Sequence, residues 1–325
     1  MKARPLDERT VTALVTAATA APSLHNAQPW HFSWRSADRT LVLRADLGRA
    51  MPRTDPDHRA LHLGCGAALF NLRVAAAHEG LHTETLLLPD PSDPVLLATV
   101  RIGEAGPADH DLAELFPAID RRHTSRHPFT DRAIPADVEK ALRDAAGREG
   151  AQLVLPGAWH TEALLDHVRD AEGRDTLEPE SLEDVLRWTG RGPEATDGIP
   201  DHALGPRARS GRAPVRDFAG RRHVPGRPTA DFETSPHLAL LGTTRDGPAD
   251  WLRAGQALER ILLLATLNGL ATALSSHALE RPDLRELARD PASDMGHVHM
   301  VLRLGYGPPG TVTPRRPLTE VLDLH

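Results

Sequence analysis

Cysteine, lysine and aromatic residues are scarce in this sequence. Cys65 is the single cysteine among 325 residues, which excludes an intramolecular disulfide and a cysteine-ligated metal cluster. The only lysines are Lys2 and Lys140, so nearly every positive charge is carried by arginine. A cationic binding site in this chain must therefore use guanidinium groups, which can bind phosphate with two parallel hydrogen bonds.

Long apolar segments are also scarce. The first ten residues, MKARPLDERT, lack the apolar core of a signal peptide. The most apolar run, residues 261–274, is too short to cross a bilayer and contains Asn268 and Gly269. The formal net charge of −7 gives no indication of a nucleic-acid partner or of an anionic membrane. We therefore expect a soluble, cytoplasmic protein with no nucleic-acid or membrane partner.

No catalytic or nucleotide-binding motif stands in a suitable context. G-x-S-x-G does not occur, and the one match to H-E-x-x-H, HEGLH (78–82), runs past the predicted helix end at Gly80, so its two histidines do not share a helix. GYGPPG (305–310) matches G-x-G-x-x-G, but its two prolines exclude the helix that must follow such a motif. His58 and His62 have a spacing that could bind a metal on a helix, yet the sequence places no third ligand beside them. We expect these two histidines to be solvated, and we expect no metal site.

Hydrophobic periodicity predicts a mixture of helices and strands. Helices are predicted at 6–20, 57–80, 135–147, 161–172 and 250–269, and strands at 40–46, 94–103, 151–157, 237–243 and 297–305. The segment at about 173–235 differs, because it is rich in proline, glycine, arginine and aspartate and has few apolar clusters. A segment of this kind is either disordered or a lid over a functional site.

The chain contains an internal repeat. Residues 66–84 align without gaps on residues 255–273, and the matched pairs include Gly66 with Gly255 and Leu69 with Leu258. The offset is a constant 189 residues, and in both copies a charged strand follows the aligned segment. This repeat predicts two related halves that are fused into an internal pseudo-dimer.

Four segments resemble motifs of one known family. PSLHNAQPWHF (22–32) is similar to the P-S-S-x-N-x-Q-P-W motif of the FMN-dependent nitroreductase superfamily. RRHTSRHPF (121–129) resembles its arginine-rich turn, GLATALSSHAL (269–279) its late flavin loop, and LRLGYGPPGTVTPRRPLTEV (302–321) its C-terminal segment. The resemblance covers most of the chain apart from the segment at about 173–235.

The resemblance implies how the halves are arranged. In ordinary members of the superfamily each FMN lies at a homodimer interface, with the Pro-Ser motif from one subunit and the arginines from the other. Here the Pro-Ser motif occurs only in the first half and the arginine motifs only in the second, as in the Acg-like branch. We therefore expect an α+β fold of two nitroreductase-like repeats, residues 1–107 and 108–325, with a lid-like insert at about 173–235. One FMN would bind between them in a monomer or weak homodimer.

The resemblance also assigns residues to the cofactor. Arginines and a hydroxyl would bind the phosphate, another arginine the pyrimidine edge of the ring, and the Pro-Ser motif the ring face and ribityl oxygens. The late loop would lie near flavin N5. The residues are Arg122, His123, Thr124, Arg315 and Arg316 in the phosphate region, Arg126 at the ring edge, Pro22, Ser23, Leu24 and Asn26 in the Pro-Ser motif, and Ser275, Ser276 and His277 in the late loop.

The implied reaction is hydride transfer from NAD(P)H to flavin N5 and then to a nitro or quinone-like acceptor, with no catalytic side chain required because the flavin carries the chemistry. Two departures from the motifs leave an alternative open. Leu24 replaces the second serine, and Ser276 and His277 stand where the family often has an acidic residue and a glycine. The alternative is a flavin storage or sequestering protein with a closed lid. A third reading is a dehydrogenase or oxidase of a natural product.

Overall fold

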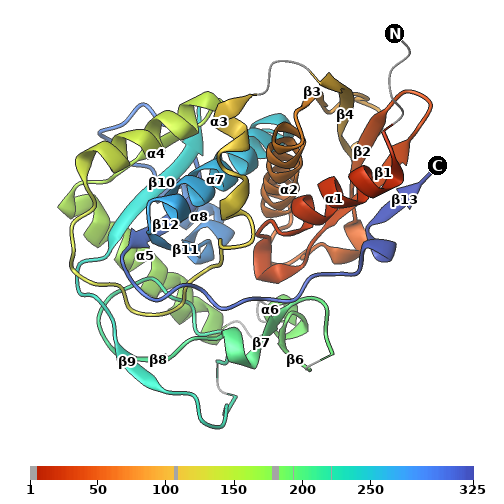
Figure 1. Ribbon diagram of the computed structural model, residues 1–325. Coiled ribbons are helices and arrows are strands. Elements are labelled where there is room, and N and C mark those ends of the chain that lie inside the picture. The colour runs from red at the N-terminus through yellow and green to blue at the C-terminus, as the bar shows by residue number, and fades with distance from the viewer. Residues whose placement is uncertain (1–5, 106–108, 178–182, 193, 221) are drawn as a thin grey trace.

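Two main β-sheets, each covered by helices, flank a pair of long central helices (Figure 1). The computed structural model describes residues 6–105, 109–177, 183–192, 194–220 and 222–325. The first sheet has the strand order β13-β1-β2-β4-β3, and the second has the order β11-β12-β10-β5. All strand pairs within these two sheets are antiparallel except the pair β1–β13, which is parallel.

The same sequence of elements occurs twice. The first half contains α1 (Glu8–Thr19), β1 (Trp30–Arg35), β2 (Thr40–Ala45), α2 (Arg59–His78), β3 (Leu81–Leu87) and β4 (Leu96–Ala105). The second half contains α4 (Ala136–Arg148), β5 (Gln152–Val154), β10 (His237–Thr243), α7 (Pro248–Leu267), β11 (Ala271–Ser275) and β12 (His297–Gly305). Both sheets therefore have corresponding strand orders, and the fold is the predicted α+β arrangement of two repeats. The predicted boundary at residues 107 and 108 lies outside the described residues and stays a prediction.

Each sheet buries an apolar face against its own pair of helices. In the first half, Leu14 of α1 and Leu69 of α2 pack with Trp30, Phe32 and Leu43 of the sheet, all at most 1% exposed. The second sheet is covered on both faces. The alternating side chains of β10 pack against α4 and α7 on one face and against α5 (Ala158–Leu177) on the other.

The central helices α2 and α7 are in contact at two glycines. Gly66 of α2 lies against Leu252 and Gly255 of α7, and Gly255 lies against Leu63 and Gly66. A Cβ atom on either glycine would overlap a backbone carbonyl oxygen of the other helix. The residues that the sequence repeat aligns are thus the residues at which the two repeats meet, which is the arrangement expected of a pseudo-two-fold axis.

The helix α2 is long and apolar enough to cross a membrane by length and composition, but 94% of its most apolar window is buried inside the structure. Several of its polar residues, among them Arg59, His62 and Asn71, are also buried. His62 is 8% exposed, its Nδ1 lies 2.7 Å from the carbonyl oxygen of His58, and its ring packs edge-on against Trp251. The expectation of a solvated histidine pair is therefore wrong for His62. Among the described residues, no group of three or more His, Cys, Asp or Glu could hold a metal.

The two repeats differ most between their first and second strands. β1 and β2 are joined by a short hairpin, whereas the corresponding strands β5 and β10 are joined by residues 155–236, which we call the insert. The predicted segment at about 173–235 is the later part of this connection. The insert contains α5, α6 (Glu183–Arg187) and short strands: β6 (Thr189–Arg191), β7 (Ile199–Pro200), β8 (Arg207–Ser210) and β9 (Thr229–Asp231). In its described part it has structure, with a small core around Ile199 and Leu204, and it lies beneath both halves (Figure 1).

The chain ends by crossing back to the first half. After β12, residues 306–321, which we call the C-terminal tail, run across the molecule to β13 (Leu322–Leu324) at the edge of the first sheet (Figure 1). In the tail, the glycines of GYGPPG allow close packing: a Cβ on Gly307 would overlap Phe129, and one on Gly310 would overlap the backbone of Thr124. No α-helix follows this motif within the tail, which contains only the short 3-10 helix Leu318–Glu320, so the motif does not form a dinucleotide site.

The glycine contact leads to a first prediction. Gly66→Ala should lower the free energy of unfolding by about 1–3 kcal/mol, because the added methyl group forces the two packed helices apart. Gly147→Ala is the matched control, since Gly147 lies in α4 with open space around its Cα, and it should raise stability by roughly 0.5–1 kcal/mol. Urea unfolding of both variants measures the difference. Equal stability of Gly66→Ala and the unmodified chain would contradict the contact.

Candidate functional site

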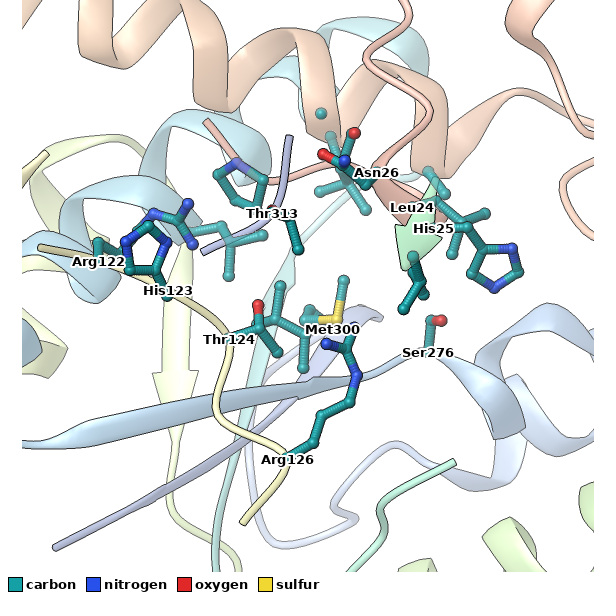
Figure 2. A pocket seen from close by; sticks show the side chains of 18 of the residues that line it. Leu24, His25, Asn26, Arg122, His123, Thr124, Arg126, Ser276, Met300 and Thr313 are labelled. Atoms are coloured by element: carbon teal, nitrogen blue, oxygen red, sulfur yellow. The ribbon is translucent and has the colours of Figure 1, made fainter. Parts of the chain in front are cut away.

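A cavity lies where the two halves, the insert and the C-terminal tail meet (Figure 2). Its empty volume, open mouth included, is about 910 Å³. The lining comes from segments that are far apart in the sequence. It consists of Pro22, Ser23, Leu24, His25, Asn26, Ala60, Leu63, Gly64, Arg122, His123, Thr124, Arg126, Ile199, Phe218, Leu258, Leu274, Ser276, Met300, Thr311, Thr313 and Arg315.

The Pro-Ser turn, residues 22–29, has a strained backbone. His25, Asn26 and Gln28 have φ values of 48°, 56° and 54°, which is the left-handed region that favours glycine. Such strain persists only where surrounding contacts impose it, and it is concentrated at functional sites. The turn ends at Pro29, and Trp30 already belongs to β1 and is fully buried.

The polar side chains of this turn hold it in place. The Asn26 amide nitrogen donates hydrogen bonds to the carbonyl oxygens of Gly198 in the insert and Pro314 in the tail, both at 3.0 Å. Its oxygen accepts a hydrogen bond from Arg315 at 3.1 Å. Gln28 donates to the Thr196 carbonyl at 2.9 Å and accepts from a tail backbone amide. Asn26 thus lines the cavity, but its amide is already bonded to protein groups rather than free for a ligand.

One end of the cavity is cationic. Arg122, His123 and Arg315 line it together, and Figure 2 shows Arg122 beside His123. The carboxylate of Glu259 in α7 offsets part of this positive charge. It lies 3.4 Å from Arg122, and both side chains are at most 3% exposed. Burial raises the pKa of Glu259, while Arg122 opposes that shift.

The two arginines at this end differ in how far they are occupied. Arg315 donates to the carbonyl oxygens of Thr19, Ala20 and Ala21 at the end of α1, at 2.8–3.2 Å. Burial, together with the charge of Arg122, lowers the pKa of Arg315 to about 9. Among the described hydrogen bonds Arg122 donates to one carbonyl oxygen, that of Ala20 at 3.0 Å, and its Nε is the atom that lies 3.4 Å from Glu259. An anion at this end would therefore meet the charges of both arginines.

Arg126 lies on another side of the cavity, with its guanidinium directed toward Met300 (Figure 2). It donates one hydrogen bond, to the Ala203 carbonyl at 3.0 Å, and its guanidinium lies 5.2 Å from the Phe218 ring centroid. No carboxylate pairs with it in the part of the chain that the structure describes. Burial lowers its pKa to about 10. Between the two cationic ends the walls are apolar, formed by side chains such as Leu63, Leu274 and Met300.

The arginine turn, residues 121–126, is positioned by the second half. Thr124 forms an isolated parallel bridge with Thr272 of β11, and the Ser125 amide donates to the Thr272 carbonyl at 2.8 Å. On its other side the Ser125 hydroxyl donates to Pro308 of the tail at 2.8 Å. The turn is thus fixed between a strand edge and the tail, rather than being the solvated basic loop that its composition alone would suggest.

The structure brings most of the predicted residues together. Ten of them line the cavity: Pro22, Ser23, Leu24, Asn26, Arg122, His123, Thr124, Arg126, Ser276 and Arg315. Ser275 and His277 line a smaller adjoining cavity instead. Arg316 lines neither cavity and is directed to Asp46 and Glu320, at 3.4 and 3.3 Å.

Sequence reasoning missed the lining residues from the insert and from α2. Ile199 and Phe218 were not predicted because the insert has no recognisable motif. Gly64 was not predicted either, yet a Cβ at this position would lie 3.2 Å from the Ser23 side chain of the Pro-Ser turn. His25 was passed over because it occupies the variable position of the motif.

Comparisons with known proteins agree with this arrangement. No family model matches the sequence. The Mycobacterium tuberculosis (strain H37Rv) protein named "Putative NAD(P)H nitroreductase Rv3131" is 33% identical over 328 residues, covering 98% of this chain and 92% of that protein. "Putative NAD(P)H nitroreductase acg" of the same organism is 32% identical over 330 residues, covering 97% and 95%. A solved structure from Anabaena variabilis, described as a putative nitroreductase, matches 92% of this chain and 88% of that one, with a TM-score of 0.51 and 12% identity.

The fold and the cavity between its halves thus define a nitroreductase-like protein built from two repeats. The extent of the relatives' alignment narrows this class further, because 98% coverage of the chain includes the insert. The chain belongs to the NAD(P)H nitroreductase family, in the branch that contains acg.

The junction at Asn26 leads to a second prediction. Asn26→Gly keeps the left-handed backbone but removes the bonds to Gly198, Pro314 and Arg315, so it should lower the free energy of unfolding by about 1–3 kcal/mol. Amide hydrogen exchange should rise in residues 194–220, which the junction attaches to the turn. Asn26→Ala adds backbone strain and should lose about a further 1–2 kcal/mol. Unchanged exchange in Asn26→Gly would show that the junction does not hold the insert.

Proposed function

We propose that this protein binds one FMN in the cavity between its halves and acts as an NAD(P)H-dependent oxidoreductase of nitro or quinone-like acceptors. One observation carries the proposal: in a chain of the nitroreductase family, a cavity with apolar walls has guanidinium groups at two separate places. The ten residues named from the sequence that line the cavity are part of this proposal.

The residues present fit this cofactor chemically. A phosphate would interact with the charges of Arg122 and Arg315 and with the Thr124 hydroxyl, all of which line the cavity. The flat ring would lie between apolar walls, and Arg126 has N–H donors left for its electron-rich edge. When bound, FMN supplies the capacity to accept and pass on a hydride.

The protein's own contribution is to orient and to exclude water. Leu24 and Leu63 narrow one wall, and Ile199 and Phe218 of the insert close another. The charge of Arg126 favours a ring that carries negative charge. No side chain is required to move a proton for the hydride step, which agrees with the lack of a catalytic motif in the sequence.

The third prediction concerns the reaction itself. The purified protein should be yellow and should lose its visible absorption when NADPH or NADH is added without oxygen. Subsequent addition of a nitroaromatic compound or a quinone should restore the colour and consume nicotinamide in repeated turnovers. A colourless protein that stays free of flavin after dialysis against excess FMN would contradict the proposal.

A second candidate function, flavin storage, is favoured by the position of the insert. Ile199 and Phe218 of the insert line the cavity. The insert is attached to the Pro-Ser turn by the Asn26 side chain, and its Asp197 forms an ion pair with Arg49 of the first half. This attachment limits access for a nicotinamide. The same spectra distinguish the two functions, since a storage protein should hold FMN tightly without bleaching when NADPH or NADH is added.

The fourth prediction tests how the phosphate is held. FMN should bind more tightly than riboflavin, and Arg315→Gln should reduce that preference by roughly tenfold, because it removes a charge from the cationic end. Arg316→Gln is the matched control. It removes the same charge, but the Arg316 side chain is directed to Asp46 and Glu320 and not into the cavity. Fluorescence titration of both flavins gives the ratio, which is insensitive to general damage. Equal effects of the two variants would exclude a specific role of Arg315.

A further inference from the structure

A smaller cavity adjoins the main one on the side of the insert. Its empty volume is about 380 Å³, mouth included. Five residues line both cavities, so the two spaces share one wall: Thr124, Arg126, Phe218, Leu274 and Ser276. The remaining lining is Pro214, Val215, Arg216, Ala273, Ser275 and His277.

The shared wall is built around Phe218. The guanidinium carbons of Arg126 and Arg216 lie 5.2 and 5.8 Å from the centre of its ring. The His25 ring packs edge-on against it at 5.2 Å. Two cations and an imidazole therefore surround one aromatic ring at the boundary of the two spaces.

The charges around the adjoining cavity do not balance. Glu280 pairs with Arg216 at 2.9–3.0 Å and accepts a hydrogen bond from the Ser276 hydroxyl at 2.8 Å. Arg126 has no carboxylate partner among the described residues, so one positive charge remains uncompensated. His25 lines the main cavity and not the adjoining one; it is 5% exposed, and neither of its ring nitrogens has a hydrogen-bond partner within the described structure.

The geometry of the adjoining cavity suits an aromatic ring with one negative charge. Pro214 and Leu274 form apolar walls, and the guanidinium of Arg126 has no carboxylate partner among the described residues. On the main-cavity side, burial and the nearby arginines Arg216 and Arg126 lower the pKa of His25 well below its usual value, so that ring is neutral and does not offset or add to the charge.

We infer that the adjoining cavity between Arg126, Arg216 and His277 is a subsite for a small aromatic anion, a carboxylate or phenolate. The anion compensates the charge of Arg126, and the ring lies along Phe218. In the proposed function, on which this step rests, such an anion is the electron acceptor. The subsite thus selects acidic aromatic acceptors over neutral ones of the same shape.

The test uses benzoate and benzamide, which have the same shape but differ in charge. Calorimetric titration of the FMN-loaded protein should give a dissociation constant at least about tenfold lower for benzoate, and Arg126→Gln should remove the difference. Arg209→Gln is the matched control, because Arg209 is an exposed insert residue paired with Asp231 and lines neither cavity. It should leave both dissociation constants unchanged.

A variant with the opposite expected sign excludes general damage as the explanation. Glu280→Gln removes the carboxylate that pairs with Arg216 at 2.9–3.0 Å while keeping a bond to Ser276, so benzoate binding should tighten by roughly three- to tenfold. Benzamide binding should not change. Equal affinity for the two compounds in the unmodified protein, or weaker binding of both in Glu280→Gln, would overturn the subsite.

Two further measurements identify the occupant. 4-Nitrobenzoate should have a lower KM than 4-nitrobenzamide with similar kcat. Displacement of benzoate by adenosine 2′,5′-bisphosphate at similar concentrations would overturn the acceptor assignment, since the anion would then belong to the nicotinamide nucleotide. If no FMN binds, the proposed function fails, and the preference for benzoate over benzamide can still be measured on the flavin-free chain. If FMN binds but benzoate is not preferred over benzamide, only the subsite fails.

Discussion

The contact between Gly66 and Gly255 is the constraint on which the rest of the structure depends. It allows the two central helices to approach until backbone meets backbone, and this fixes the spacing between the repeats. The N-terminal turns of α2 and the middle of α7 then face the same space, where Leu63 and Leu258 line the cavity. A larger residue at either glycine would separate the repeats and move Leu63 away from Leu258. The shape of the cavity therefore depends on the same contact as the packing of the two halves.

Two repeats related by this contact could form two sites, but the second position has a different lining. Applying the repeat offset of 189 places Arg253 where the first site has Gly64, and the corresponding groove is lined by Arg73, Glu149 and Gln256 among others. Glu149 pairs there with Arg73 at 2.7 Å. The ten residues between α1 and β1, which include the Pro-Ser turn, correspond to three residues between α4 and β5. Long side chains and a shortened turn therefore make the groove at the second position unlike the cavity at the first.

The sequence predicted the elements with a strong period and missed those that depend on distant partners. α2, β10 and β12 were predicted within two residues of their ends, since long apolar patterns define them. β1, β3 and β11 were missed because their strand character comes from pairing across the sheets. Of the site, the positions that carry a motif were predicted. The direction of Arg316 and the occupied amide of Asn26 could not be, because both depend on where the tail and the insert lie.

The strained turn shows why this site cannot form locally. Left-handed conformations at His25, Asn26 and Gln28 are unfavourable in an isolated peptide, by about 1–2 kcal/mol each. They are stabilised here by the hydrogen bonds that Asn26 donates to Gly198 and Pro314, which lie 172 and 288 positions further along the chain. The turn therefore takes its shape only after the insert and the tail have packed. It follows that a single event, the closure of these two segments on the turn, both completes the cavity and buries the arginines that surround it. An anionic ligand offsets the electrostatic cost of that burial, so ligand binding and closure must stabilise each other.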